Sequence, residues 1–593
     1  MRKTVIIIIF FVGANLSLFS QGTSDPCKKS TEGTDFWFGF MESRNYSNNH
    51  YIEITVTARE STKFKIFTGA QETQYGSEYL VQGNNSVQIR ISPWELVEAT
   101  GSEEIQDKGI RLVSENPVNV YALNYDRSSA DVAVIYPIES LGKEYFAICF
   151  DPRIDERNDG SYGNGRNSQF LVVAAEDSTR VIIIPSKVTD KLVNANDSII
   201  VTLSKGEVYQ VQSMNFDNLT GQGDLTGSYI LSDKPIAFFS GSLATTIPAE
   251  SGVNAWDHLY EQIPPIHSWG REYFAVPLKS REQDRYRVMA AKDSTIIYID
   301  GSPPIFLDRG EFEEFVLYYN NPKRIYSEKP ILVAQYSQSK SVDNNYTGGH
   351  GDPFMIILSS TTQSKNDVTF VAYDSNQIQK YYVNIVTLTS EVGNIRFDGL
   401  TIQNEFKPFT GSFFSYAQKA IYPGTHRINN INEDRGFLAY VYGFGNVESY
   451  GYGVGFNLDL VLDLGESINF HGDTLLLCHG DSRKLDAGPY FDTYNWNTGD
   501  STQTLTVSEG GKYHVKTTTI DGCELEDSIY VFVSHPIVDL EIDYDDGCSP
   551  YSIELNGNDG FSNYLWQNGD GDTISKNQII NAFQTDEYRI TVF

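Results

Sequence analysis

The residues best suited to chemistry stand close together in the segment "DHLYE", where two carboxylates flank an imidazole. Asp257, His258 and Glu261 could together bind a metal or transfer protons. Buried polar groups are usually paired for structural reasons alone, so we expect these side chains to hydrogen-bond a long connection. His350 and Asp352, in "GGHGDPF", allow the same two interpretations, and the neighbouring glycines and proline favour a turn.

Other motifs with chemical meaning are weak. The chain contains no Gly-x-Ser-x-Gly, His-Glu-x-x-His or Walker sequence. The Gly-rich stretch Asn158–Ser168 lacks the Lys-Ser/Thr ending of a phosphate loop, and we expect a solvated loop there. The acidic run Asp543–Gly547 could hold calcium, although an acidic linker is the favoured explanation. We therefore predict no enzyme, no catalytic residue and no metal ligand.

Charge and the first residues define the expected compartment. The formal net charge is −32, which repels a phosphate backbone and argues against nucleic acid as a partner. Arg2 and Lys3 precede the apolar run Val5–Val12, which predicts a signal peptide over residues 1–20, cleaved near Ser20 and Gln21. No later segment has the roughly 20 apolar residues of a membrane-spanning helix. We expect a protein that is secreted or displayed at the cell surface.

The elements that must position these residues are strands. Aromatic residues make up 13% of the chain, and short runs of Tyr, Val, Ile and Thr alternate with turn residues. In "YIEITVTA", Ile52, Ile54 and Val56 alternate with Glu53 and other polar residues, which is the period of a half-buried strand. The composition and patterning predict an all-β protein.

One strand-turn-strand sequence occurs three times in the chain, and we interpret each copy as a hairpin with a Ser-Thr turn. The copies are Ile52–Phe67, Phe170–Ile184 and Tyr286–Ile299. Ser61, Ser178 and Ser294 occupy the same place in the three copies. A Ser-acid-x-Pro turn that should open a strand follows each copy, at Ser114, Ser232 and Ser327. Fixed spacing of this kind predicts a repeat.

The repeated phrases define the expected domains. "LGKEYFAI" at Leu141 and "WGREYFAV" at Trp269 are a further pair, and a fourth, degenerate copy runs from Tyr381 to Gly445. We expect an array of β-sandwich-type repeats, either separate or closed into a propeller-like ring. The predicted repeats are about 31–155, 156–280, 281–375 and 376–458.

The rest of the chain has a second repeat with an offset of 70 residues. Cys478 aligns with Cys548, and Trp496 aligns with Trp566. We expect two small Ig-like or PKD-like sandwiches at 466–535 and 536–593, with the second truncated and with the tryptophans in the cores. A Cys478–Cys523 disulfide would stabilise the first by about 4 kcal/mol. The two cysteines left over, Cys27 and Cys149, could pair with each other.

Three phrases carry a resemblance to a known family. They are "GTDFWFGFM" (Gly33–Met41), "AWDHLYEQIPPIHSWGREYF" (Ala255–Phe274) and "GDPFMIIL" (Gly351–Leu358). Residues 31–458 resemble the N-terminal domain family of IgGFc-binding proteins, and the modules that follow resemble those of Bacteroidetes surface proteins. The resemblance implies a secreted binding protein in which the family-motif residues are structural. Those residues are Asp257, His258, Glu261, Pro264 and Pro265.

The favoured hypothesis is a non-catalytic adhesion protein for a glycoprotein, mucin or polysaccharide, with the C-terminal modules as a spacer. We predict the ligand surface in two Tyr-rich loops, Gln338–Asp352 and Tyr442–Gly453. The candidate residues are Tyr346, His350, Asp352, Tyr450 and Tyr452. Two alternatives stay open: a secreted glycoside hydrolase with two facing carboxylates, and a purely structural spacer.

Overall fold

The computed structural model describes most of the chain, and this part contains only strands and short 3-10 turns. The all-β prediction is confirmed. The chain divides into two compact units: the first runs to Val461 and includes Thr519–Glu524, and the second consists of Leu462–Thr518 and Leu525–Phe593. The described residues are 27–592 without 44–49, 127–128, 153–166, 215–222, 251, 344–349, 375–376, 447, 461, 463, 465–473, 479, 489, 520–521, 535–540, 544–552, 558–562 and 583–586.

The strands of the first unit fall into four successive sets. The first set is β1 (Glu32–Phe38), β2 (Tyr51–Ala58), β3 (Thr62–Thr68), β4 (Thr73–Val81), β5 (Asn85–Ile91), β6 (Ile105–Gln106), β7 (Ile110–Asp126) and β8 (Ser129–Ile135). The second set is β9 (Gly142–Phe146), β10 (Ser168–Ala174), β11 (Thr179–Ile184), β12 (Ile199–Leu203), β13 (Val208–Gln212), β14 (Tyr229–Thr245) and β15 (Asp257–Gln262).

The third set is β16 (Glu272–Ala275), β17 (Gln283–Ala290), β18 (Thr295–Ile299), β19 (Ile305–Leu307), β20 (Phe312–Tyr318), β21 (Lys323–Ser327), β22 (Ile331–Ser337) and β23 (Phe354–Ile357). The fourth set is β24 (Asp367–Ala372), β25 (Ile378–Leu388), β26 (Ile395–Phe397), β27 (Leu400–Thr401), β28 (Lys407–Pro408), β29 (Phe414–Ile421), β30 (Gly424–Asn430), β31 (Phe437–Gly445) and β32 (Glu448–Gly453). Short 3-10 turns connect them: η1 (Trp94–Leu96), η2 (Ile138–Ser140), η3 (Ile266–Ser268), η4 (Lys340–Val342), η5 (Thr361–Gln363), η6 (Thr389–Glu391) and η7 (Gln403–Glu405).

The same order of strand pairing is found in all four sets. In the first set the long strand β7 pairs with β1 and β3 through its first half and with β2 and β8 through its second half. In the second set β14 pairs in the same way with β9 and β11, then with β10 and β15. The central strand of the third and fourth sets is interrupted, so β21 and β30 take the first role and β22 and β31 the second.

The predicted hairpins are wrong in a specific way. The two strands of each phrase, such as β10 and β11, do not pair with each other but bind opposite halves of the same central strand. Ser178 and Ser294 take positive φ values of 55° and 53°, and Thr179 and Thr295 donate hydrogen bonds back to Glu176 O and Lys292 O. The left-handed residue redirects the chain sharply, so the turn carries it from one half of the central strand to the other.

The Ser-acid-x-Pro phrase marks the bend in the central strand. Ser114 Oγ donates to Asn116 O at 2.8 Å, and Ser232 Oγ donates to Lys234 O at 2.6 Å. The register of β14 with β9 shifts between Leu231 and Ile236. The predicted strand start at this proline holds only for the third set, where β22 begins at Ile331; in the first two sets one strand runs through the bend.

Strand pairing places the divisions between the sets earlier along the chain than the predicted repeat boundaries. Strands β9, β16 and β24 pair with the central strands that follow them, so the divisions fall near 136–141, 263–271 and 358–366. The Gly-x-x-Tyr-Phe phrase opens the second and third sets. Its first residue must be small, because a Cβ at Gly142 or Gly270 would lie within 2.4 Å of Pro265 or Ser360. Only glycine allows this close approach.

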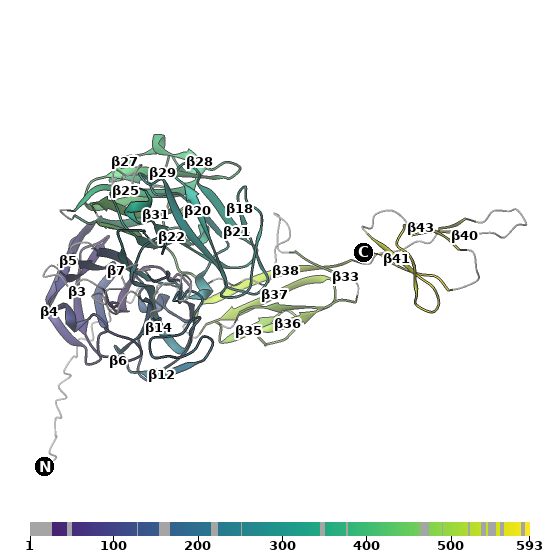
Figure 1. Ribbon diagram of the computed structural model, residues 1–593, viewed down its shortest axis with the longest axis horizontal. Helices are drawn as coiled ribbons and strands as arrows, with labels where there is room; N and C mark the ends of the chain where they lie inside the picture. The colour runs from purple at the N-terminus through teal and green to yellow at the C-terminus, as the bar shows by residue number, and fades with distance from the viewer. Residues whose placement is uncertain are drawn as a thin grey trace, which may run out of the picture. The chain divides into compact units, whose positions relative to one another are not determined.

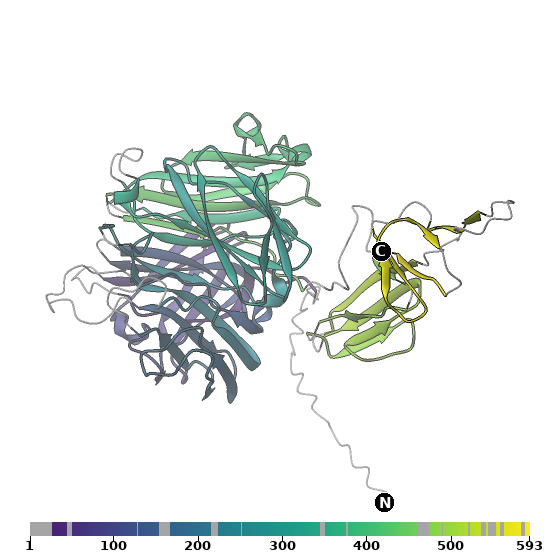
Figure 2. The same ribbon diagram turned by 45° about the vertical axis from the view of Figure 1, so that its right-hand side comes forward.

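Packing joins sets that are far apart in sequence. One apolar core contains residues of the first and fourth sets and some of the second, another joins the second to the third, and another the third to the fourth. Both faces of β2 are therefore buried, and its predicted half-buried character is wrong. The fourth set covers its polar face: Thr57 Oγ1 donates to Thr369 O at 2.8 Å. Figures 1 and 2 show the four sets, coloured from purple to green, as one body of packed sheets.

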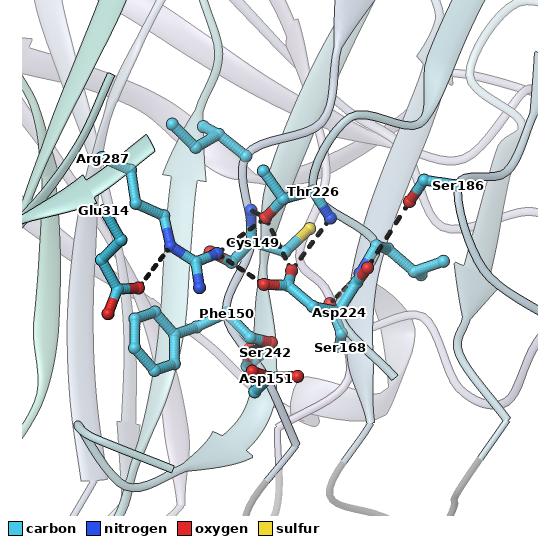
Figure 3. Close-up of polar contacts among 12 residues, drawn as sticks. Cys149, Phe150, Asp151, Ser168, Ser186, Asp224, Thr226, Ser242, Arg287 and Glu314 are labelled. Carbon is cyan, nitrogen blue, oxygen red and sulfur yellow. Dashed lines mark hydrogen bonds and ion pairs between the residues drawn. The ribbon is translucent and has the colours of Figure 1, made fainter. Parts of the chain in front are cut away.

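A buried arginine joins the second and third sets. Arg287 of β17 is 2% exposed, and its guanidinium contacts Asp224 at 2.7 Å and Glu314 at 3.0 Å. It also donates to Cys149 O and lies 4.3 Å from the centre of the Phe150 ring. Figure 3 shows the guanidinium between the two carboxylates. The guanidinium thus finds its partners in both sets, which is the condition under which a buried charge is tolerated.

The second unit contains two groups of strands. The first group is β33 (Thr474–Cys478), β34 (Arg483–Asp486), β35 (Thr493–Trp496), β36 (Thr504–Val507), β37 (Gly511–Thr518) and β38 (Glu524–Ser534). The second group is β39 (Glu541–Asp543), β40 (Ile553–Asn556), β41 (Tyr564–Gln567), β42 (Thr573–Ser575), β43 (Ile579–Ala582) and β44 (Arg589–Val592). Trp496 and Trp566 are buried, as predicted, and their indole N–H groups donate to Thr502 O and Asn577 O.

The predicted disulfide pairing is wrong. Cys27 is bonded to Cys523, within the first unit, while Cys149 is buried and Cys478 exposed as free thiols. In the parallel pair of β33 with β38, Cys478 lies opposite Ser534, eleven residues beyond Cys523. At about 3.3 Å per residue these two cysteines are about 35 Å apart along the sheet, far beyond the reach of a disulfide.

Replacing Arg287 with Met should destabilise the first unit strongly. Asp224 and Glu314 would lose their buried partner, and we expect a loss of about 3 to 5 kcal/mol in the free energy of unfolding. Arg427→Met is the matched control because Arg427 pairs with Asp367 at a partly exposed site, where we expect about 1 kcal/mol or less. Chemical denaturation of the two variants measures both values, and equal losses would contradict the structure.

Thiol chemistry should report the cysteine pairing directly. We expect a non-reducing digest to contain a peptide linking Cys27 to Cys523. N-ethylmaleimide should label Cys478 in the native protein but reach Cys149 only after unfolding, because burial raises the pKa of the Cys149 thiol to about 12. A peptide linking Cys478 to Cys523 would instead support the pairing expected from the sequence.

Candidate functional site

A cavity of about 60 Å³ lies between the first and fourth sets. Strands β2, β5, β7 and β8 supply one side of it, and β25, β32 and the segment after β24 supply the other. Its lining residues are Tyr51, Glu53, Gln88, Arg90, Leu123, Tyr125, Ala130, Tyr373, Asp374, Ile378, Glu448 and Tyr450. Gln88, Arg90 and Asp374 are exposed, whereas Glu448 and Tyr450 are buried, so the cavity has a polar mouth and a closed end.

The register of three strands builds the wall of the cavity. Tyr51 lies opposite Tyr125, and Glu53 lies opposite Arg90, on one face of the sheet. The two tyrosine rings stack at 4.6 Å, and the guanidinium of Arg90 lies 4.0 Å above the Tyr51 ring. Arg90 Nε also contacts Glu53 at 3.0 Å. Cross-strand pairs thus fix an aromatic wall with one ion pair along it.

Glu448, the first residue of β32, forms the closed end of the cavity. It is 1% exposed, and neither carboxyl oxygen has a hydrogen-bond partner among the described residues. Burial, followed by the nearby Asp352 and Asp126, raises the pKa of Glu448 to about 10. At neutral pH this carboxyl is therefore protonated in the unliganded protein.

The arrangement suits binding of a small group. Four tyrosines, Tyr51, Tyr125, Tyr373 and Tyr450, present apolar rings with polar edges, and the Glu448 carboxyl can donate or accept a hydrogen bond. Pockets of mostly apolar walls with a few convergent polar groups are typical of ligand sites. No group of three or more His, Cys, Asp and Glu residues that could hold a metal ion is found among the described residues.

Only some of the predicted ligand residues lie in or near the cavity. Tyr450 lines the cavity, and Asp352 lies near Glu448, with its carboxylate accepting a hydrogen bond from Ser449. Tyr452 is fully buried and donates to Val371 O. His350 contributes its carbonyl oxygen to Arg281 at 3.0 Å. Tyr346 lies outside the described residues.

The predicted Tyr-rich loop 442–453 is a buried hairpin made by β31 and β32. The aromatic residues of this segment are buried because the hairpin packs between the first, third and fourth sets. Its tyrosines therefore serve as core and cavity wall, and an exposed adhesive loop here is wrong.

The residues of the "DHLYE" segment belong to strand β15 and to no long connection, which corrects that expectation. Asp257 Oδ1 accepts from the N–H of His258 at 2.7 Å, and its other oxygen accepts weakly from Ala130 N at 3.4 Å. Burial raises the pKa of Asp257 and of Glu261, and lowers the pKa of His258 to about 4. All three side chains are at most 1% exposed, and none of them lines the cavity.

Asp257 and Asp352 form a buried carboxyl pair. The two carboxyl groups lie close enough to interact electrostatically, and burial raises the pKa of both, in the case of Asp352 to about 7. Asp352 is 1% exposed. Pro264 and Pro265 follow β15; the Pro264 carbonyl accepts from the Trp269 indole, and Pro265 packs on Gly142. These family-motif residues hold neighbouring strands together at the centre of the unit.

Sequence reasoning missed most of the cavity. Tyr51, Glu53 and Arg90 belong to strand patterns with ordinary alternation. Tyr125 is the penultimate residue of β7 and belongs to no motif. Glu448 could have been recognised from the sequence, because a carboxylate inside the apolar, aromatic run "GFGNVESYGYG" is unusual in a strand expected to be buried. The acidic run Asp543–Gly547 lies largely outside the described residues.

Comparison with known proteins identifies the family. A family model described as IgGFc binding protein matches residues 131–443, which is more than half of the chain. The chain therefore belongs to the IgGFc-binding protein family. It is similar to the IgGFc-binding protein of Homo sapiens, with 24% identity over 427 residues, and this match covers 69% of the chain but 7% of the human protein.

Two solved structures show only distant similarity. The N-terminal eight Ig domains of Down syndrome cell adhesion molecule align over 94% of this chain and 84% of theirs, with 9% identity and a TM-score of 0.14. The human desmocollin-1 ectodomain aligns over 75% of this chain and 96% of its own, with 11% identity and a TM-score of 0.12. Scores of this size do not indicate a shared fold.

Within the part of the chain that the structure describes, no helix is long and apolar enough to cross a membrane.

The carboxyl pair should make stability depend on pH. Asp352 has a pKa of about 7 in the folded protein, against 3.8 for an ordinary aspartate, so the stability it contributes is complete below about pH 3.8 and is lost as pH rises through about 7. We expect the free energy of unfolding to fall by an amount of the order of 4 kcal/mol from this group. Asp352→Asn should flatten the fall between about pH 4 and 7, which is the interval between the unfolded and folded pKa values.

Asp190→Asn, at an exposed position, is the control and should leave the pH dependence of the wild-type protein unchanged. Thermal unfolding of the three proteins across this pH range measures the effect. An Asp352→Asn curve parallel to that of the wild type would contradict the buried pair.

Proposed function

We propose that this protein is a secreted or cell-surface binding protein without catalytic activity, and that the cavity between the first and fourth sets is its ligand site. The observation that carries the proposal is a buried carboxyl, Glu448, with both oxygens unpartnered among the described residues at the end of an aromatic cavity. Leaving such a group without a partner costs free energy, and a ligand that supplies the partner recovers it. The second unit would act as a spacer.

The proposal includes a view of the architecture. The four sets would be copies of one all-β module, closed into a ring by the contact of the fourth set with the first. The recurring strand order supports common modules. Closure is supported by hydrogen bonds between the ends of the array: Thr31 N–H donates to Phe456 O, and Leu458 N–H donates to Lys29 O. The predicted sandwiches and the predicted ring would then both be features of one structure.

The ligand would be an extracellular macromolecule. A glycoprotein, a mucin or a polysaccharide is a suitable ligand class, because the predicted signal peptide would export the protein to where such molecules occur. IgG Fc is included among the candidates because of the name of the human relative. The net charge of −32 disfavours nucleic acid. Binding is favoured over hydrolysis because the paired carboxyls Asp257 and Asp352 are sealed from solvent, with exposures of 0% and 1%.

A panel of glycoproteins, mucins, polysaccharides and IgG Fc tests the proposal. The full chain should bind at least one of them saturably, and Tyr125→Leu should weaken that binding about tenfold because half of a stacked aromatic wall is lost. Tyr326→Leu is the matched control, since Tyr326 stacks on Tyr298 at 5.1 Å in the third set, away from the cavity. Equal binding by both variants would place the ligand elsewhere. Absence of binding across the panel would favour the spacer.

A further inference from the structure

The Glu448 carboxyl is buried, and its hydrogen-bonding capacity is not satisfied by the described residues. It is 1% exposed, and its two oxygens lack hydrogen-bond partners. The arginine that lines the cavity, Arg90, is already held by Glu53 at 3.0 Å. An ionised carboxylate in such a position is stable only beside a positive charge, because burial without one costs several kcal/mol.

We propose that the cavity receives one positively charged side-chain tip, the ammonium group of a lysine on the surface of a partner protein, with Glu448 as its counter-ion. This inference rests on the proposed function, since it assigns a chemical class to the ligand of the same cavity. It narrows the candidate ligands to those with a protein component.

The charges and rings around the cavity select a cation over a neutral sugar. Glu448, Glu53 and Asp374 line it with a single basic residue, Arg90, so the balance of ionisable groups is acidic. The tyrosine wall adds to this preference, because aromatic ring faces attract an ammonium group within about 6 Å. The guanidinium of Arg90 already makes such a contact with Tyr51, at 4.0 Å from the ring centre.

Size and shape favour lysine among cations. A volume of about 60 Å³ accommodates the compact end of a lysine side chain. An ammonium group has three donors that two carboxyl oxygens can share, whereas a guanidinium is wide and planar. A free metal ion is disfavoured because no suitable group of ligands is found among the described residues. The net charge of −32 would also speed encounter with a basic partner surface.

Binding of a cation should release a proton from Glu448. The titratable and charged groups that lie near it or line the same cavity are Asp352, Asp126, Asp374 and the four tyrosines, together with the pair of Glu53 and Arg90. Asp352 and Asp126 disfavour its ionisation in the free protein, and an ammonium would reverse that preference. Affinity should therefore rise with pH, by up to about tenfold per pH unit, until the ammonium itself begins to lose its proton near about pH 10.

Small probes test this inference without knowledge of the natural partner. Nα-acetyl-lysine amide and Nα-acetyl-norleucine amide differ in the charged group, and their binding to the full chain can be followed by ligand-observed NMR at pH 7, 8 and 9. We expect the lysine amide to bind, with a dissociation constant that falls about tenfold per pH unit. The norleucine amide should bind at least about tenfold more weakly at pH 9.

Two variants test whether Glu448 is responsible for binding of the lysine amide. Glu448→Gln, which resembles the protonated carboxyl, should keep the fold but lose both the binding of the lysine amide and its pH dependence. Glu261→Gln replaces another buried glutamate, outside the cavity, and should bind like the wild type. The inference is overturned if norleucine amide binds as well as lysine amide, if Glu448→Gln binds unchanged, or if neither probe binds the wild type.

The result separates this inference from the proposed function. Saturable binding of a panel member that is weakened by Tyr125→Leu, together with failure of the lysine probe, would leave the cavity as the ligand site and assign it an uncharged ligand. Failure of both experiments would remove the cavity from consideration as a binding site.

Discussion

The contact between the first and fourth sets of strands is the constraint on which the rest of the first unit depends. Tyr121 and Val454 are 333 positions apart, yet the Tyr121 hydroxyl donates to the Val454 carbonyl at 2.7 Å inside a shared apolar core. This contact covers the polar face of β2, which would otherwise meet water. It also creates the cavity, because each set alone supplies only one wall of it. Stability and the candidate site therefore have the same origin.

Buried charge is handled in two different ways in this protein. Arg287 has a carboxylate on either side and a carbonyl in reach, so its burial joins two sets while its donors stay satisfied. Glu448 is equally buried but has no such partners among the described residues. The contrast makes Glu448 informative, since the cost of keeping an unpaired group is offset only if something else supplies the missing partner.

Membership of the IgGFc-binding protein family describes the descent of the chain and leaves its ligand open. The human relative is many times longer than the matched segment, so its name belongs to a protein of which this chain resembles a small part. The cavity offers a more specific guide, because its walls come from residues that can be changed singly. A lysine-bearing partner would be consistent with a glycoprotein as the ligand and would disfavour a polysaccharide without charge.

The sequence alone determined the strand content, the positions of the turn phrases and the two buried tryptophans of the second unit. These are local properties, fixed by alternation and by turn residues such as Ser178 and Ser294. Tertiary structure decided which strands pair, because the two strands of the same phrase can pair with each other as a hairpin or with opposite halves of a third strand. It also decided the pairing of Cys27 with Cys523 and the meeting of Glu448 with Tyr51. Distances between residues that lie far apart along the chain depend on how the sets pack, and no pattern within a single strand contains that information.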